Sequence, residues 1–335
     1  MRNQLSLLLF LSLLPFLFMK VRPQQQLAPA LYAFGDSLAD DGNNNFLVSL
    51  SRSNYAPYGV DFPNGPTGRF TNGYTSTDII AQLLGLPLPP PYLSITSAKI
   101  SKVVTGANYA SGSAGILDES GKTFGERLPF NKQLDLFQKT VQQQLPSQFN
   151  SSQALQQHIS KSIFMVQIGS NDYLNNYLLP EYYPTSRDYT PPAFANLLTQ
   201  NLSQQLTGTN GTCSDRVNNI VALFNDQLPP LLTTLTSTLN GSIFVYGNLF
   251  GPMSNMTSNP STFGMLVTNK PCCVADVSGS TLCRPLLPPC RNREQYLFWD
   301  GVHPTPILNA LFANACFNQS TTLCSPLNIQ QLTRA

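Results

Sequence analysis

The sequence predicts an α/β protein in which a mostly parallel β-sheet carries helices on both faces. Two observations lead to this fold class: short apolar runs that stop at turn residues, and longer helical stretches that alternate with them along the chain. A parallel strand pair needs a long crossover connection, and that connection is usually a helix. With 335 residues, 42% of them hydrophobic, the chain is large enough to build one such domain around a sizeable core.

The expected strands are short, apolar and followed by glycine or small residues. They span residues 30–34, 103–109, 163–168 and 243–246. Gly35-Asp36-Ser37 follows the first strand, a loop with Gly112 follows the second, and Gly169 to Asp172 follows the third. In an open parallel sheet, ligands bind at the carboxyl ends of the strands. These three polar clusters therefore predict a site at that edge of the sheet.

Helices are expected where apolar residues recur with a helical period. The helical stretches are 77–84, 130–145, 151–158, 193–206, 215–239 and 307–317. Pro229 and Pro230 should break or kink the stretch 215–239, because a proline inside a helix removes a hydrogen bond and clashes with the preceding turn. Residues 54–72 and the Cys-rich segment 272–290 are expected to be loops.

Residues 1–26 are expected to be a secretory signal peptide. Arg2 supplies the positive start, and residues 5–19 form an almost unbroken apolar run that is too short to span a bilayer. An uncleaved anchor is the alternative. After cleavage near residue 26, a single domain over residues 27–335 would remain. No later segment is apolar enough to cross a membrane, so no stable membrane insertion is expected.

Sequons and cysteines independently favour a secreted protein of the extracellular space or cell wall. Asn-X-Ser/Thr acceptors stand at Asn150, Asn201, Asn210, Asn240, Asn255 and Asn318. The seven cysteines are Cys213, Cys272, Cys273, Cys283, Cys290, Cys316 and Cys324. In an oxidising compartment they would form disulfides, and an odd count leaves at least one thiol without an intramolecular partner. Zinc is disfavoured because no Cys-X-X-Cys pair occurs and only 2 histidines are present, so no metal is expected.

The charge balance excludes some partners. Charged residues make up 11% of the chain, and the formal net charge is +2. A protein so nearly neutral, without a Lys/Arg run, has no electrostatic reason to bind nucleic acid. The oligomeric state does not follow from these numbers.

Ser37 is the candidate nucleophile, and His303 with Asp300 is the candidate base and its orienting carboxylate. A serine hydroxyl is a weak nucleophile until a base takes its proton. Asp300 precedes His303 by three residues, a spacing that puts carboxylate and imidazole on one face of a helical turn. Two bland alternatives remain: Ser37 caps a helix, or Asp300 caps the last one. The other histidine, His158, is expected to be a solvated side chain on a surface helix.

An acyl-transfer site also needs donors for the oxyanion of its tetrahedral intermediate. The candidates are the backbone N–H groups of Ser37 and Gly112 and the side-chain amide of Asn171. The alternatives are a simple turn at Gly112 and an Asx-turn at Asn171. Gly-X-Ser-X-Gly does not occur in the chain, which argues against the ordinary α/β-hydrolase layout.

Four segments in order resemble the sequence blocks of plant GDSL esterase/lipases, which are SGNH hydrolases. They are FGDSLADDGNN at 34–44, NYASG at 108–112, GSND at 169–172 and FWDGVHPT at 298–305. GRFTNG at 68–73 and the pair Cys272-Cys273 are also similar to family landmarks, and the resemblance runs from about residue 30 to the end.

The resemblance implies a three-layer α/β/α sandwich around a mostly parallel, flavodoxin-like sheet with strand order 2-1-3-(4)-5. It also implies a serine hydrolase that cleaves carboxylic esters of lipids or other acyl compounds, with no cofactor. In it, Ser37, Asp300 and His303 form the triad, while Gly112 and Asn171 bind the oxyanion.

One departure from the family pattern leads to a hypothesis. Family members usually carry a further strand and a Gly-Pro-Leu-Gly-Cys-like turn after the third block, and no such run occurs between residues 168 and 243. We hypothesise an internal deletion or skipped exon that leaves Cys213 as the free thiol, which a thiol titration of the denatured, unreduced protein would test. Two other functions remain open: a catalytically weak secreted glycoprotein that serves as a binding or structural module, and acyl transfer to an alcohol.

Overall fold

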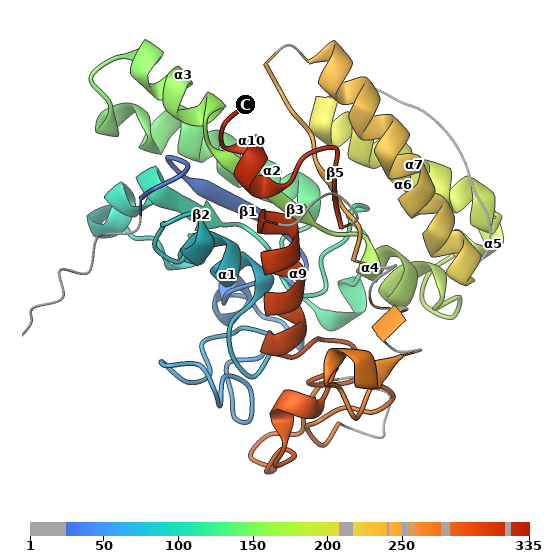
Figure 1. Cartoon of the computed structure of the whole chain (residues 1–335). Helices are drawn as coiled ribbons and strands as arrows, with labels where there is room; N and C mark the ends of the chain where they lie inside the picture. Colours follow the sequence, from blue (N-terminus) through green and yellow to red (C-terminus); the bar gives the residue numbers. More distant parts are fainter. Residues whose placement is uncertain are drawn as a thin grey trace, which may run out of the picture.

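The computed structural model describes a three-stranded parallel sheet in the middle of the molecule (Figure 1). Strand β1 (Leu31–Gly35) lies at its centre, between β2 (Gly106–Asn108) and β3 (Ile163–Gln167). The order β2-β1-β3 confirms the predicted α/β class and the first three positions of the predicted strand order. The described residues are 25–207, 217–239, 241–249, 253, 255–256, 259–275, 282–318 and 323–335.

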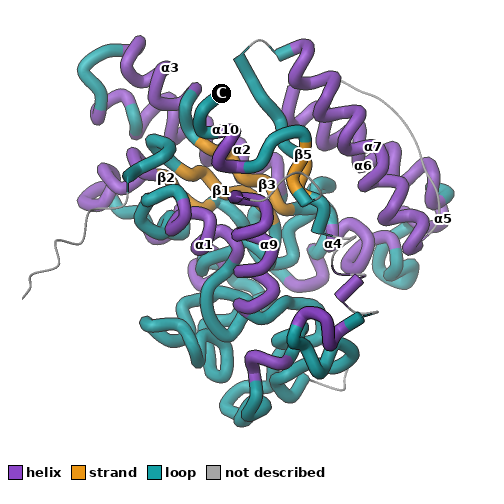
Figure 2. The backbone as a smooth tube through the Cα atoms, in the orientation of Figure 1, coloured by secondary structure: helices purple, strands orange, loops and turns teal. Residues whose placement is uncertain are grey.

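Helices cover both faces of the sheet, which gives the three layers seen in Figure 2. Successive residues of β1 point to opposite faces. Leu31 packs with the helices α1 (Ser76–Leu83) and α9 (Pro306–Asn318) on one face. Tyr32 packs with α2 (Phe130–Lys139) on the other, where α6 (Pro191–Thr207) adds Phe194 and Leu198 to the same core.

The remaining elements are short. They are α3 (Ser152–Ser160), α4 (Ser170–Asp172), α5 (Thr185–Asp188) and α10 (Ile329–Leu332), the 3-10 or π turns η1 (Asn43–Phe46), η2 (Tyr92–Ser94), η3 (Ser97–Thr105), η4 (Lys122–Phe124), η5 (Thr140–Gln144), η6 (Pro146–Gln148), η7 (Tyr173–Tyr177), η8 (Pro260–Phe263) and η9 (Arg293–Gln295). Residues 97–105 form η3, so the second strand is shorter than the predicted 103–109.

Helix α7 (Val217–Thr238) continues through Pro229 and Pro230, so the prolines do not break it, and the predicted alternative of a kink stays a prediction. The two prolines remove the hydrogen bonds that would end on the carbonyl groups of Asn225 and Asp226. Asn225 is half-buried and Asp226 is exposed, so water can bond to the carbonyl groups that the prolines leave free.

The predicted strand at 243–246 does not extend the parallel sheet. Instead, β4 (Tyr246–Gly247) pairs antiparallel with β5 (Cys324–Ser325) in a separate two-stranded sheet. No strand of the described residues pairs with the outer edge of β3. Phe164 and Val166 on that strand are 43% and 40% exposed. An exposed apolar edge is expected where a strand of the family pattern is missing.

The disulfides join neighbouring cysteines late in the chain. They are Cys272–Cys290, Cys273–Cys283 and Cys316–Cys324. Cys213 lies outside the described residues, so the hypothesis that it is free stays a hypothesis. In the described part of the chain, no helix is both long enough and apolar enough to cross a membrane.

The sequons that the structure describes differ in accessibility. Asn150, Asn255 and Asn318 are exposed and can be reached by a glycan-transferring enzyme. Asn201 is half-buried within α6, where its amide donates to the carbonyl oxygen of Leu197, so it suits glycosylation poorly. Asn210 and Asn240 lie outside the described residues.

Candidate active site

Ser37, His303 and Asp300 come together at the carboxyl edge of the sheet. Ser37 follows β1 directly, and its Oγ lies 2.7 Å from Nε2 of His303. Nδ1 of His303 lies 2.8 and 2.9 Å from the two carboxylate oxygens of Asp300. Asp300 and His303 are buried, whereas Ser37 is half-buried and so remains open to a substrate.

The Asp300–His303 segment is held as a hydrogen-bonded bend rather than a helical turn. Oδ1 of Asp300 accepts the backbone N–H groups of Val302 and His303, at 3.0 and 2.9 Å. The ring of Phe70 packs on the imidazole with 5.0 Å between centroids. With Nδ1–H directed at the carboxylate, Nε2 presents its lone pair to Ser37, which is the tautomer that a general base needs.

Asp36 is a buried carboxyl group next to Ser37. Its Oδ1 accepts the N–H of Leu38 at 3.0 Å, whereas no described residue bonds to its Oδ2. Burial raises the pKa of Asp36 to about 7, against an ordinary value of 3.8, because an ionised carboxylate is poorly solvated there.

This pKa predicts a pH-dependent stability. Between pH 4 and pH 7 the folded protein keeps a proton on Asp36 that the unfolded chain releases, so the free energy of unfolding should fall by up to a few kcal/mol as the pH rises through this window. Asp36→Asn should make that slope shallower. Urea unfolding of both proteins at several pH values measures it, and parallel pH profiles for the two would contradict the prediction.

The predicted oxyanion donors differ in whether their N–H groups already have a hydrogen-bond acceptor. The N–H of Gly112 donates to Oδ2 of Asp40 at 3.0 Å, so it has an acceptor before substrate arrives, and its role as an oxyanion donor stays a prediction. A Cβ at Gly112 would lie 2.7 Å from both Asn44 and Phe70, so close packing explains this glycine. Nδ2 of Asn171 donates to the carbonyl oxygen of Ala114 at 2.9 Å, which leaves its second hydrogen for a ligand.

The third candidate donor is the backbone of Ser37. Its N–H makes no hydrogen bond to a described residue. An unpaired N–H beside the nucleophile is what an oxyanion donor requires before substrate arrives. Among the described contacts, Ser37 and Asn171 each keep a hydrogen for an oxyanion, and Gly112 stays a predicted donor.

Two buried carboxylates organise the loops around this site, and the sequence reasoning did not single them out. Asp40 accepts the N–H groups of Gly42 and Asn43 in addition to that of Gly112. Asp172 accepts hydrogen bonds from the backbone N–H groups of Ile116 and Leu117 and from the hydroxyl of Ser120. Both aspartates lie inside the segments that resemble the family blocks. The resemblance could therefore have pointed to them.

Arg69 forms a buried ion cluster beneath the same loops. Its Nε and Nη2 each donate at 2.7 Å to one carboxylate oxygen of Asp78, and Nε lies 3.6 Å from Asp41. The guanidinium also lies 4.3 Å from the centroid of the Phe62 ring. Burial raises the pKa of Asp41 to about 8, although the nearby Arg69 cation acts in the opposite direction.

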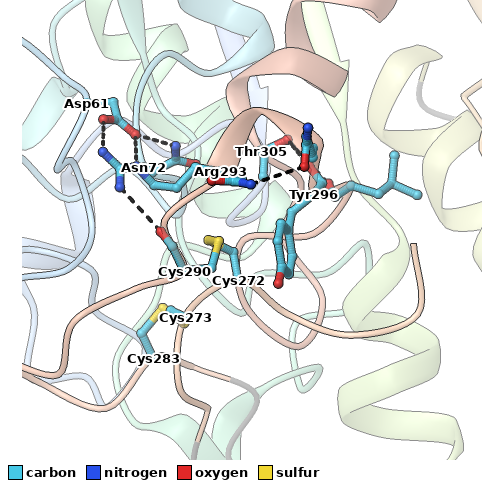
Figure 3. The surroundings of a disulfide bond; sticks show 12 residues. Asp61, Asn72, Cys272, Cys273, Cys283, Cys290, Arg293, Tyr296 and Thr305 are labelled. Carbon is cyan, nitrogen blue, oxygen red and sulfur yellow. Dashed lines mark hydrogen bonds and ion pairs between the residues drawn. A yellow bond between two sulfur atoms is a disulfide. The ribbon is translucent and has the colours of Figure 1, made fainter. Parts of the chain in front are cut away.

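A small hollow lined by Ser37 has a volume of about 10 Å³, roughly the space of one water molecule. A second hollow of about 280 Å³ is lined by none of the proposed triad or oxyanion residues. Its lining residues are Asp61, Asn72, Arg291, Arg293, Glu294, Thr305, Pro306 and Ile307. Figure 3 shows the Asp61–Arg293 pair beside the two disulfides of residues 272–290.

His158 differs from its prediction. It is half-buried, with Nε2 3.4 Å from the Tyr32 hydroxyl and its ring 4.8 Å from that of Phe149. Burial lowers its pKa, so it is a packed neutral side chain rather than a solvated one. Across the described residues, no group of three or more His, Cys, Asp and Glu side chains is placed to hold a metal ion.

A parallel α/β sheet with a Ser–His–Asp contact at its carboxyl edge is the arrangement of a serine hydrolase. The GDSL-like Lipase/Acylhydrolase family matches residues 31–316, and the chain belongs to this family. GDSL esterase/lipase 7 of Arabidopsis thaliana is 42% identical, over 98% of this chain and 99% of that protein. GDSL esterase/lipase At1g33811 of the same plant is 40% identical, over 97% of each chain. The chain is thus a carboxylic ester hydrolase by family.

The alignment lengths bear on the missing strand. The alignment with GDSL esterase/lipase 7 is 363 positions long, and 98% of the 335 residues of this chain is about 328. About 35 positions of the alignment are therefore gaps in this chain. Both proteins are aligned almost from end to end, so this shortfall is internal to the chain. It supports the hypothesis of an internal deletion.

Proposed function

We propose that this chain is a secreted enzyme that hydrolyses carboxylic esters through an acyl-enzyme on Ser37. The observation that carries the proposal is the 2.7 Å contact between Ser37 Oγ and His303 Nε2, with Asp300 on the other side of the imidazole. Nucleophile, base and orienting carboxylate stand in hydrogen-bond reach, which is the geometric requirement for an activated serine.

In this mechanism Ser37 Oγ attacks the ester carbonyl carbon while its proton passes to Nε2 of His303. Asp300 holds Nδ1–H and stabilises the imidazolium that forms. The oxyanion is bound by the N–H of Ser37 and the free amide hydrogen of Asn171. His303 then protonates the leaving alcohol, and a water molecule deprotonated by the same nitrogen hydrolyses the acyl-enzyme.

Export of the protein is supported by the disulfides and by the exposed sequons. Three disulfides persist only in an oxidising compartment. Residues 1–26 would be removed on export and residues 27–335 would form one domain, and a family match over 31–316 agrees with that division.

The second candidate function, a catalytically weak binding or structural module, has one observation in its favour. In the part of the chain that the structure describes, no strand pairs with the outer edge of β3, where Phe164 and Val166 are exposed, and this supports the loss of a strand of the family pattern. A weakened sheet could leave the triad in place yet loosen the loops that position it.

Short-chain nitrophenyl esters and a fluorophosphonate probe test the proposal together. The disulfide-bonded wild type should release nitrophenol, and the probe should add its mass to the peptide that contains Ser37. Heat-unfolded protein, which keeps Ser37 but not its base, is the labelling control and should not react. A folded wild type that neither turns over esters nor reacts at Ser37 would refute the enzyme and favour the binding module.

A further inference from the structure

Asp300 has a second side-chain partner besides His303. The hydroxyl of Tyr58 donates to Oδ2 of Asp300 at 2.6 Å, and both side chains are fully buried. Tyr58 comes from the long loop near the start of the chain, 242 residues before Asp300. The carboxylate that faces the imidazole is therefore also held from behind by a side chain outside the proposed triad.

The hydroxyl of Tyr58 is in turn held by the disulfide-bonded loop. It accepts the backbone N–H of Cys283 at 3.1 Å, and Cys283 is bonded to Cys273. The N–H of Cys273 donates to the carbonyl oxygen of Trp299 at 2.9 Å, next to Asp300 in the chain. The contacts form a closed ring from Asp300 through Tyr58 and the disulfide back to residue 299. Figure 3 shows the Cys273–Cys283 bond.

We propose that Tyr58 is a positioning residue for ester hydrolysis, and that the Cys273–Cys283 disulfide keeps it against Asp300. The proposal rests on the proposed function, since it assigns how the carboxylate of that triad is oriented. It gives this disulfide a role in turnover that the Cys316–Cys324 bond, between α9 and β5, does not share.

The chemistry of Tyr58 suits a permanent donor. Burial and the nearby Asp300 carboxylate raise the pKa of Tyr58 well above 10, so its hydroxyl keeps its proton throughout the working pH range. A fixed donor on Oδ2 locks the carboxylate plane toward Nδ1 of His303 and takes up part of its negative charge. Without that donor, Oδ2 would keep more of its negative charge, and the backbone N–H groups of Val302 and His303 would hold the carboxylate through Oδ1 alone.

Tyr58→Phe removes the donor and keeps the buried ring. We expect kcat to fall roughly tenfold with little change in KM, because a hydrogen bond to a charged group is lost. We also expect the acid limb of the kcat/KM profile to move to higher pH, because protonated His303 is then favoured. Asp36 and Tyr55, the other titratable groups near this pair, are unchanged in the variant.

Tyr55→Phe is the matched control. The Tyr55 hydroxyl lies near Tyr58 and donates to the carbonyl oxygen of Cys283 at 2.9 Å, so its loss loosens the same loop while the Tyr58–Asp300 hydrogen bond stays in place. It should lower the thermal midpoint somewhat and leave the pH profile in place. If Tyr58→Phe kept the wild-type kcat and acid limb, or if both variants shifted the limb alike, the positioning role would be refuted. Wild-type turnover and the loss of it in Ser37→Ala show independently whether the proposed function itself holds.

The disulfide is tested by the pair Cys273→Ser/Cys283→Ser, made in the wild type and in Tyr58→Phe. In the wild type, this pair of substitutions should reproduce most of the loss of kcat seen in Tyr58→Phe. In the Tyr58→Phe background it should lower kcat little further, because both changes remove the same interaction. Cys316→Ser/Cys324→Ser is the control for the loss of a disulfide alone. Equal losses in both backgrounds would mean that the bond acts independently of Tyr58, which refutes this part of the proposal.

Discussion

Ser37→Ala is expected to lower kcat for nitrophenyl esters by roughly 10⁴- to 10⁶-fold, while the protein stays folded. The loss is large because the hydroxyl is the group that forms the acyl-enzyme, and nothing else beside His303 Nε2 can replace it. Ser37 is half-buried and its Oγ has one described partner, so alanine removes the nucleophile without opening a core cavity. Circular dichroism and urea unfolding should therefore match the wild type.

His303→Ala should cost about as much as Ser37→Ala, and the double variant hardly more than either. Groups that act as one unit are not additive, since removing either one already stops the proton transfer from serine to imidazole. Steady-state kinetics on the two single variants and the double variant measure this. Losses that multiplied in the double variant would mean that Ser37 and His303 act independently, and the triad assignment would then be wrong.

The triad residues could be predicted from the sequence because the signal for them is local. Ser37 directly follows an apolar strand, and Asp300 and His303 stand three residues apart, so strand pattern and spacing made them candidates, and the resemblance to the family blocks implied their roles. Tyr58 had no such signal. It lies in a loop rich in Pro, Gly and Asn, and only the folded chain brings it to a carboxylate 242 residues away.

The incorrect expectations share a physical cause, because each treated a local preference as decisive. Pro229 disfavours a helix locally, yet its lost hydrogen bond ends at a carbonyl group that water can reach. Residues 243–246 have the composition of a sheet strand. The strand that forms there is β4 (Tyr246–Gly247), and its partner β5 lies more than 70 residues later in the sequence. Burial and long-range pairing decide such cases, and neither can be read from a short window.

Arg69→Gln should lower the free energy of unfolding by about 3–5 kcal/mol, the largest stability effect that we expect at a side chain outside the proposed triad. Arg69 is the cation between Asp78 and Asp41, whose side chains have no exposed surface. Glutamine cannot supply the paired donors that hold Asp78, so the Asp78 carboxylate would be left buried without its counter-charge. Urea unfolding at neutral pH, with the midpoint and slope fitted together, measures the loss.

Arg293→Gln is the matched control for this loss, because it removes the same group from a second bidentate pair. Arg293 and Asp61 join at 2.8 and 2.9 Å, but their side chains are 30% and 37% exposed. Water and salt screen such a pair, so its loss should cost at most about 1 kcal/mol. Equal losses in the two variants would contradict the argument, since only burial separates the two pairs.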